Sequence, residues 1–291
     1  MAPQRHGSGD PTFRRDGPRT WRAFRTPEGP ATLCVQERDA DGVVLARAWG
    51  EGAGWVLARV PDLLGGADDV STFVPGHPLV EQAWRRHGHL RFGRSGLVMD
   101  SLVPAVIEQK VTGQEAFAGY RALVLRLGGP APGGHEVPAG LTLPPAAEDV
   151  AALPSWEWLR LHVDPARSRA LVGAARVAPS LERLAGGTGE AAERAMRSLP
   201  GIGEWTAAEV RQRSFGDADA VSFGDYHVAK DAGWALSGRP YDDDELRERL
   251  APWAGHRSRV TLLLRLHVGG RPRRGPRMAP RTHLPARTPG R

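Results

Sequence analysis

The chain has 291 residues, 41% of them hydrophobic, so it can bury a substantial core and is long enough for two packed units. Its net charge of +6 favours a polyanionic partner only weakly, because seven Arg between 271 and 291 account for the excess. The single cysteine, Cys34, excludes an intramolecular disulfide and a cysteine-ligated iron–sulfur cluster. No apolar run reaches the roughly 18 residues of a membrane span and no secretory signal is visible, so we expect a cytoplasmic protein.

The composition of the first 76 residues changes near residue 23. Residues 1–22 are rich in Gly, Pro and Arg and show no periodicity, so we expect a disordered tail. Residues 23–76 contain short apolar runs separated by Gly and Asp turns, among them TLCVQ, VVLARAWG and GWVLARV. Runs of this kind are typical of strands. The sequence therefore predicts a small antiparallel sheet in this N-terminal region.

From residue 77 to residue 269 the apolar residues recur mostly at helical spacing, which predicts an all-helical domain. A stretch rich in Gly and Pro interrupts this pattern between residues 128 and 153. It is too long for a tight turn, and we expect a surface excursion. Residues 270–291 are basic and of low complexity, which predicts a flexible tail. The expected fold is mainly α, with a small antiparallel β-region and disordered termini.

The segment RAMRSLPGIGEWTAAEVRQ has the pattern of a helix, a hairpin (Leu199–Gly203) and a second helix. Pro200 ends the first helix, while Gly201 and Gly203 permit a tight turn at which backbone N–H groups and a helix N-terminus converge. Such an array binds phosphate without base preference. Taken alone, the turn is compatible with a structural role and with a DNA-backbone clamp in equal measure.

An irregular Gly and Asp loop, GDADAVSFGDYHVAK, follows about twenty residues later and leads into a helix that begins near Asp225. A carboxylate at a helix start is usually a cap. The same position behind the hairpin would also put the Asp225 carboxylate at the mouth of a cleft that faces bound DNA. The two roles are compatible, because a helix N-terminus keeps a carboxylate ionised.

These segments resemble a known family. LPGIGEWTA followed by GDYHVAK is similar to the signature of the helix-hairpin-helix DNA glycosylase superfamily, specifically its 3-methyladenine glycosylase II branch. AVIEQKVTGQEA (105–116) resembles the helix-loop-helix that approaches the lesion in that family. The likeness covers about residues 97–268, and the spacing from the hairpin to Asp225 is its most specific element. It implies base-excision repair of double-stranded DNA, with Asp225 as the catalytic carboxylate.

The resemblance also implies the type of reaction. Members that cut the strand as well carry a lysine just after the hairpin, which forms a Schiff base with the sugar. In this sequence that position is Trp205, which implies a monofunctional glycosylase without lyase activity and with water as the nucleophile. Breaking the N-glycosidic bond builds positive charge on the sugar, which ionised Asp225 can stabilise.

Further site residues follow from the resemblance, each with a structural alternative. The nucleotide must be flipped and the gap filled by a wedge. Gln109 and Lys110 occupy the wedge positions, although such helix-terminal residues are ordinarily solvated. Trp205 and Tyr226 would line the base pocket, although either can equally be packed against the protein. Glu209 stands where an aromatic residue is expected, and a second negative charge there would favour a cationic base or bond an exocyclic amino group.

The hairpin itself carries two implied contacts. The backbone of Pro200, Gly201, Ile202 and Gly203 would contact DNA phosphates. The carbonyl groups of Leu199 and Ile202 would hold a monovalent cation that bridges to a phosphate, with no other cofactor required.

Two rival functions remain open at this point. A DNA-binding protein could keep the hairpin and lack catalysis, but it would have no reason to retain Asp225. An active glycosylase could instead act on a deaminated or oxidised base, which Glu209 and Lys110 make hard to dismiss. For the main hypothesis, an alkylated-purine glycosylase, we expect a nucleoid-associated monomer whose basic tail is a salt-sensitive DNA tether.

Overall fold

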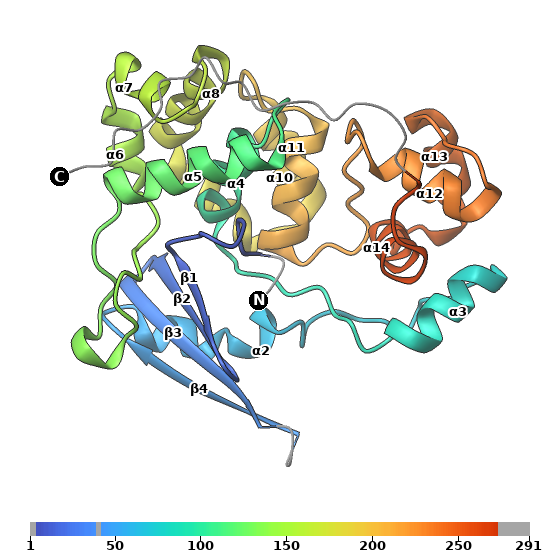
Figure 1. Cartoon of the computed structure of the whole chain (residues 1–291), viewed down its shortest axis with the longest axis horizontal. Coiled ribbons are helices and arrows are strands. Elements are labelled where there is room, and N and C mark those ends of the chain that lie inside the picture. Colours follow the sequence, from blue (N-terminus) through green and yellow to red (C-terminus); the bar gives the residue numbers. More distant parts are fainter. Residues whose placement is uncertain (1–3, 39–41, 273–291) are drawn as a thin grey trace.

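The N-terminal part of the chain folds into a four-stranded antiparallel sheet in which each strand pairs with the next one along the sequence (Figure 1). The computed structural model describes residues 4–38 and 42–272. Successive residues of a strand point to opposite faces of the sheet, and here both faces carry buried apolar side chains. The strands are β1 (Phe13–Asp16), β2 (Arg19–Thr26), β3 (Gly29–Arg38) and β4 (Val43–Trp49).

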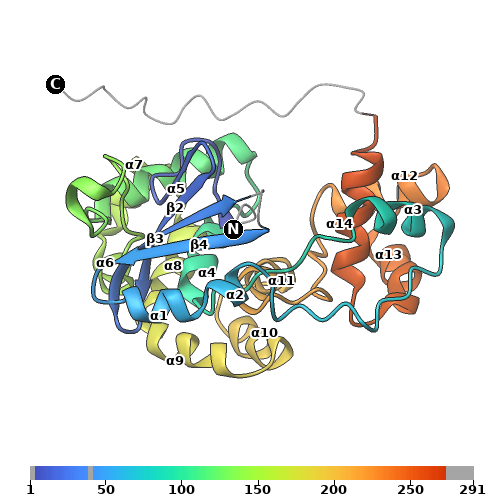
Figure 2. The same cartoon turned by 90° about the horizontal axis from the view of Figure 1, so that it is seen from below.

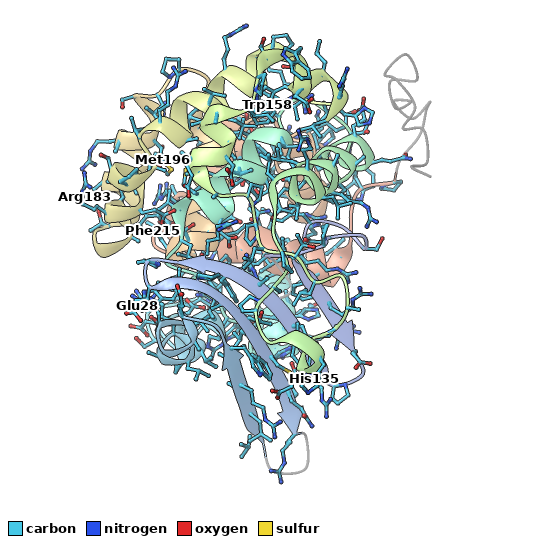
Figure 3. The ribbon with its side chains drawn as sticks, turned by 90° about the vertical axis from the view of Figure 1, so that its left-hand side faces the viewer. Glu28, His135, Trp158, Arg183, Met196 and Phe215 are labelled. Atoms are coloured by element: carbon cyan, nitrogen blue, oxygen red, sulfur yellow. The ribbon has the colours of Figure 1, made fainter. Side chains whose placement is uncertain are left out.

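One face of the sheet packs on two short helices, α1 (Ala53–Ala58) and α2 (Val60–Leu63), around the fully buried Phe24 and Leu33. The other face is covered by the stretch that interrupts the helical pattern, and Figure 3 shows this loop, labelled at His135, beside the strands. Its residues Val137, Leu141 and Leu143 pack against Trp21, Ala23 and Cys34. The expected surface excursion is therefore a structural cover, because its residues Val137, Leu141 and Leu143 are buried against the sheet.

The segment expected to be a disordered N-terminal tail is folded from Gln4 onward, and residues 1–3 lie outside the described part. Its glycine and arginine content suggested disorder, but its polar groups find fixed partners. The Asp10 carboxylate accepts hydrogen bonds from the backbone N–H groups of His6 and Thr12, both at 2.9 Å. Arg22 pairs with Asp100 inside the protein. The Asp10 bonds order the segment locally, and the pairing of Arg22 with Asp100 on α4 ties it to the helices.

A first helical core surrounds α4, which is buried from Ser101 to Ile107. Figure 3 shows Trp158 and Met196 among the helices above the sheet. Their side chains are buried, with 1% and 0% of their surface exposed. This core explains the apolar helical periodicity of the middle of the chain. Its helices are α4 (Val98–Ile107), α5 (Gly113–Leu127), α6 (Ala147–Ala152), α7 (Ser155–Arg160), α8 (Pro165–Arg176), α9 (Ala178–Glu182), α10 (Gly189–Arg197) and α11 (Glu204–Val210).

A second helical core lies beside the first (Figures 1 and 2). In it α3, which comes early in the sequence, packs on α14, the last described helix. In the described part of the chain three stretches join the cores: residues 64–77 and 88–97, on either side of α3, and the loop 216–227. The loop carries Asp225, so the division into two cores puts the candidate catalytic residue at a junction. The helices of this core are α3 (Pro78–His87), α12 (Val228–Ser237), α13 (Asp243–Leu250) and α14 (Arg257–Val268).

The described helices include none that is long and apolar enough to cross a membrane. The predicted fold class, mainly helical with a small antiparallel sheet at the N-terminus, is confirmed. The predicted basic tail falls almost wholly on residues 273–291, which lie outside the described part.

Stability should decline in mild acid because of His256, which is buried just before α14. Its Nδ1 accepts a hydrogen bond from Arg259 (3.2 Å) and its Nε2 contacts the Thr72 hydroxyl (2.9 Å), an arrangement that suits neutral imidazole. Burial, followed by the charge of Arg259, lowers the pKa of His256 from its usual 6.5. Protonation of His256 is therefore less favourable in the folded state than in the unfolded chain. The stability that neutral His256 contributes is fully present above pH 6.5 and is lost as the pH falls from there through the lowered pKa of the folded state.

Urea midpoints at pH 7.5, 6.5 and 5.5 test this dependence. The His256→Gln variant should lose less stability between pH 7.5 and 5.5 than the wild type, because it has no proton to take up. Equal losses in the two proteins would contradict the assignment to His256.

Candidate functional site

The predicted hairpin connects α10 to α11 in the expected way. The Ile202 N–H donates to the Leu199 carbonyl at 3.1 Å, which closes the turn, and Ile202 is buried in the first core. Gly201 has a φ of +87°, a left-handed value that favours glycine. Pro200, Gly201 and Gly203 are exposed. The turn thus presents its backbone to solvent while the Ile202 and Leu199 side chains anchor it to the first core.

The turn between α4 and α5 lies beside the hairpin, on the side of the molecule away from the sheet (Figure 1). The Gln109 side-chain amide donates to the Gly201 carbonyl (3.0 Å) and to the Thr206 hydroxyl (2.8 Å). Lys110 is exposed and has a φ of +54°. Of the two predicted wedge residues, Gln109 is therefore tied to the hairpin in this structure, and Lys110 projects beside it.

Asp225 lies at the end of the loop 216–227, directly before α12. Its Oδ1 accepts hydrogen bonds from the N–H groups of His227 (2.7 Å) and Val228 (3.0 Å), so the carboxylate caps the helix. Within the described residues no group donates to its Oδ2. The structure thus combines the cap geometry with one carboxylate oxygen that remains available.

Trp205 is half-buried in the first turn of α11 and lies next to the Asp225 loop. A Cβ atom built on Gly224 would be 3.9 Å from the Cβ of Trp205. The hairpin helix and the Asp225 loop therefore meet at Trp205. Tyr226 has a different place: it is 65% exposed, and the Lys230 ammonium lies 3.7 Å from its ring centroid. Tyr226 stands at the surface beside Asp225 and does not form an enclosed wall.

Two contacts that hold the Asp225 loop were not predicted. The Arg247 guanidinium, from α13, donates to both carboxylate oxygens of Glu204 at 2.7 Å and lies 3.6 Å from the ring centroid of Phe223. The Gly224 N–H donates to the Asp243 carboxylate at 2.8 Å. The sequence gave no sign that Arg247 bridges the two cores.

Glu209 lies one helical turn beyond Trp205, with 13% of its side chain exposed. Its Oε1 accepts from the Ser222 hydroxyl, and its Oε2 accepts from the Arg213 guanidinium. Both oxygens are occupied and the charge is paired. The expected free negative charge at this position is therefore not present in this arrangement.

The hairpin carbonyls that the resemblance implied as cation ligands are those of Leu199 and Ile202. The Leu199 carbonyl accepts one hydrogen bond in the turn, and no described N–H donates to the carbonyl of Ile202. The described residues contain no cluster of three or more His, Cys, Asp or Glu side chains suited to a metal ion.

A polar cavity of about 850 Å³ lies at the other end of α11, between the sheet and α9–α10. Figure 3 shows Arg183 and Phe215, two of its lining residues, above the end of the sheet marked by Glu28. Its carboxylates are largely engaged, for example Asp217 with Arg211 and Asp62 with Arg94. None of the predicted site residues lines this cavity.

Comparison with known proteins bears on the fold. No family model matches the sequence, and no curated protein matches it. Among solved structures, a 3-methyladenine DNA glycosylase from Archaeoglobus fulgidus is similar, with a TM-score of 0.68 and 19% identity over 87% of this chain and 88% of that one.

An 8-oxoguanine glycosylase/lyase from Clostridium acetobutylicum in complex with double-stranded DNA matches with a TM-score of 0.66 and 12% identity, covering 89% of each chain. A 3-methyladenine DNA glycosylase from Schizosaccharomyces pombe in complex with abasic DNA matches with a TM-score of 0.52 and 14% identity over 65% of this chain and 90% of that one. The resemblance read from the hairpin and Asp225 is thus confirmed at the level of architecture: this chain has the fold of the helix-hairpin-helix DNA glycosylases.

Proposed function

We propose that this protein is a monofunctional DNA glycosylase that excises damaged bases, in particular alkylated purines, from double-stranded DNA. The observation that carries the proposal is the meeting of Asp225, Trp205 and the α10–α11 hairpin, on a fold shared with solved DNA glycosylases. The hairpin supplies exposed backbone for a phosphate, and Asp225 supplies a carboxylate beside it. Neighbours named for 3-methyladenine favour alkylated bases, whereas those named for 8-oxoguanine keep the oxidised class as the alternative.

In the proposed reaction the damaged nucleotide is flipped out of the duplex and its base stacks near Trp205. The N-glycosidic bond breaks as positive charge develops on the sugar, and the base leaves with the bonding electron pair. The Asp225 carboxylate stabilises that charge through its free Oδ2 and orients the attacking water. An alkylated purine already carries positive charge, so it needs little acid assistance to leave.

The proposal includes the absence of strand cleavage, because Trp205 offers no amine at the position behind the hairpin. The chain has only two lysines, Lys110 and Lys230, so any Schiff base could be assigned by substitution. The Lys230 ammonium is positioned over the Tyr226 ring.

Base release from duplex DNA tests the proposal. Oligonucleotides carrying 3-methyladenine, 7-methylguanine, 8-oxoguanine or uracil are incubated with the protein, and abasic sites are scored separately from strand breaks. We expect release of the methylated purines without breaks and without a borohydride-trapped complex. Tight binding without any release would favour the non-catalytic DNA-binding alternative. A trapped complex lost in Lys110→Arg or Lys230→Arg would contradict the monofunctional assignment.

The hairpin backbone gives a prediction with a built-in control. Gly201→Ala should lower the unfolding free energy by about 1–2 kcal/mol, the cost of a left-handed non-glycine residue. It should also weaken DNA binding, since the new Cβ would be 2.8 Å from the Cβ of Ala170 and would displace the turn. Gly203 is the control, because its φ is −96° and a Cβ there meets open space.

Urea unfolding and fluorescence anisotropy with abasic DNA measure the two effects. Gly203→Ala should unfold like the wild type, so that any loss of DNA affinity in that variant reports direct contact with the DNA. If Gly201→Ala bound DNA like the wild type, the hairpin would not be the phosphate-binding element.

A further inference from the structure

Glu209 has an environment that does not suit a base-reading residue. Its carboxylate is mostly buried and spends one oxygen on the Ser222 hydroxyl and the other on Arg213. A group that reads a nucleobase needs a free donor or acceptor directed at the base. Each Glu209 oxygen already accepts a hydrogen bond, one from Ser222 in the loop 216–227 and the other from Arg213, so its contacts tie it to that loop.

Arg213 keeps the Glu209 carboxylate compensated. It lies in the π-helical turn η4 (Arg211–Phe215) that continues α11. Burial lowers the pKa of Arg213, but the carboxylates of Glu209 and Glu108 more than offset this effect, so its pKa lies above the usual value. Glu108 in turn contacts His6 at 3.1 Å. The charged guanidinium therefore holds the Glu209 Oε2 atom, while Ser222 binds Oε1.

Ser222 connects this pair to the candidate catalytic residue. It is 5% exposed, and its hydroxyl donates to Glu209 while it accepts from the Gln212 side-chain amide at 3.1 Å. The same amide donates to the Ala220 carbonyl at 2.7 Å. The Ser222 carbonyl accepts from the Asp225 N–H at 3.2 Å. A continuous set of hydrogen bonds thus runs from Glu209 through Ser222 to the backbone of Asp225.

We propose that Glu209 is a positioning residue that sets the place of Asp225 through Ser222, and that it does not read the base. This inference rests on the proposed glycosylase function. The loop needs such support because its backbone is irregular, with Gly224 at a φ of +87°. A displacement of a catalytic group by about 1 Å can lower a rate on the order of 100-fold.

Single-turnover base release by Glu209→Ala, Ser222→Ala and the double variant tests the route. We expect each single variant to lose about 10- to 100-fold in rate, with affinity for abasic DNA within about twofold of the wild type. Because both residues act through the same path, the double variant should be no slower than the slower single variant. Glu209→Gln should recover part of the rate, because its carbonyl oxygen can still accept from the Ser222 hydroxyl.

Glu190 supplies the matched control. Its carboxylate also pairs with an arginine of the η4 turn, Arg211 at 3.4 Å, but it is exposed on α10 and does not contact the loop. Glu190→Ala should release bases at the wild-type rate. Circular dichroism melting of all variants separates loss of fold from loss of position, since a merely structural role would lower the melting temperature and leave the rate of the folded protein unchanged.

Three outcomes would overturn the inference. Unchanged rates in Glu209→Ala or Ser222→Ala would show that the loop holds its place without them. Losses that multiply in the double variant would show that the two residues act separately. A changed preference between 7-methylguanine and a neutral base in Glu209→Ala but not in Ser222→Ala would show that Glu209 reads the base. If the wild type released no base at all, the glycosylase assignment would fail first, and the positioning role would fall with it.

Discussion

Asp225→Asn should lower the single-turnover rate of base release by about 100- to 1000-fold, the loss typical of removing one preorganised electrostatic group, while DNA affinity stays within about twofold. Asparagine has nearly the same shape and retains a carbonyl oxygen for the N–H groups of His227 and Val228, which Asp225 now accepts at 2.7 and 3.0 Å. The cap is therefore preserved. The negative charge that would stabilise the developing sugar cation is lost.

Asp164→Asn is the control for this substitution. The Asp164 carboxylate caps α8 in the same manner, with its Oδ1 accepting from the N–H groups of Ala166 (2.9 Å) and Arg167 (3.0 Å), but it belongs to the first core and not to the candidate site. It also pairs with Arg167 at 2.9 Å, so its loss should cost at least as much stability. If Asp225→Asn remained as active as Asp164→Asn, Asp225 would be a helix cap only.

The sequence was most informative where structure is local. The hairpin and the capping carboxylate each depend on a few adjacent residues, and both have the predicted geometry. The place of Trp205 beside the Asp225 loop was expected only through the family resemblance, which put Trp205 in the base pocket, and its own neighbours in the sequence did not indicate it. The type of each long helix was likewise encoded in its own apolar periodicity.

What the sequence did not reveal depends on pairings between distant residues. Helical periodicity gives the buried face of α3 but not its partner, so the second core, in which α3 packs on α14, was not anticipated. The order of residues 4–12 rests on contacts such as His6 with Glu108, about a hundred residues apart. Glu209 was assigned a free charge because its neutralising partner, Arg213, and its hydroxyl partner, Ser222, become evident only in the fold.

Asp68→Asn should destabilise the protein by about 3–5 kcal/mol, the usual cost of leaving a buried charge without its partner. Asp68 and Arg259 form an ion pair in which the side chains are only 4% and 3% exposed. The second oxygen of Asp68 accepts from the Phe92 N–H at 2.8 Å. Asparagine can keep that backbone contact, but the Arg259 guanidinium would remain buried without its compensating charge.

The exposed pair of Glu81 with Arg85 on α3 provides the comparison. These side chains are 54% and 74% exposed and 3.6 Å apart, so Glu81→Gln should cost less than about 1 kcal/mol. Urea unfolding of the two variants at pH 7.5 measures the difference, and equal midpoints would contradict the importance of the buried pair. Because Asp68 lies in the connection between the cores and Arg259 on α14, the loss should also weaken the attachment of the second core. Base release in Asp68→Asn should then fall at temperatures where the first core is still folded, since the loop that carries Asp225 depends on both cores for its position.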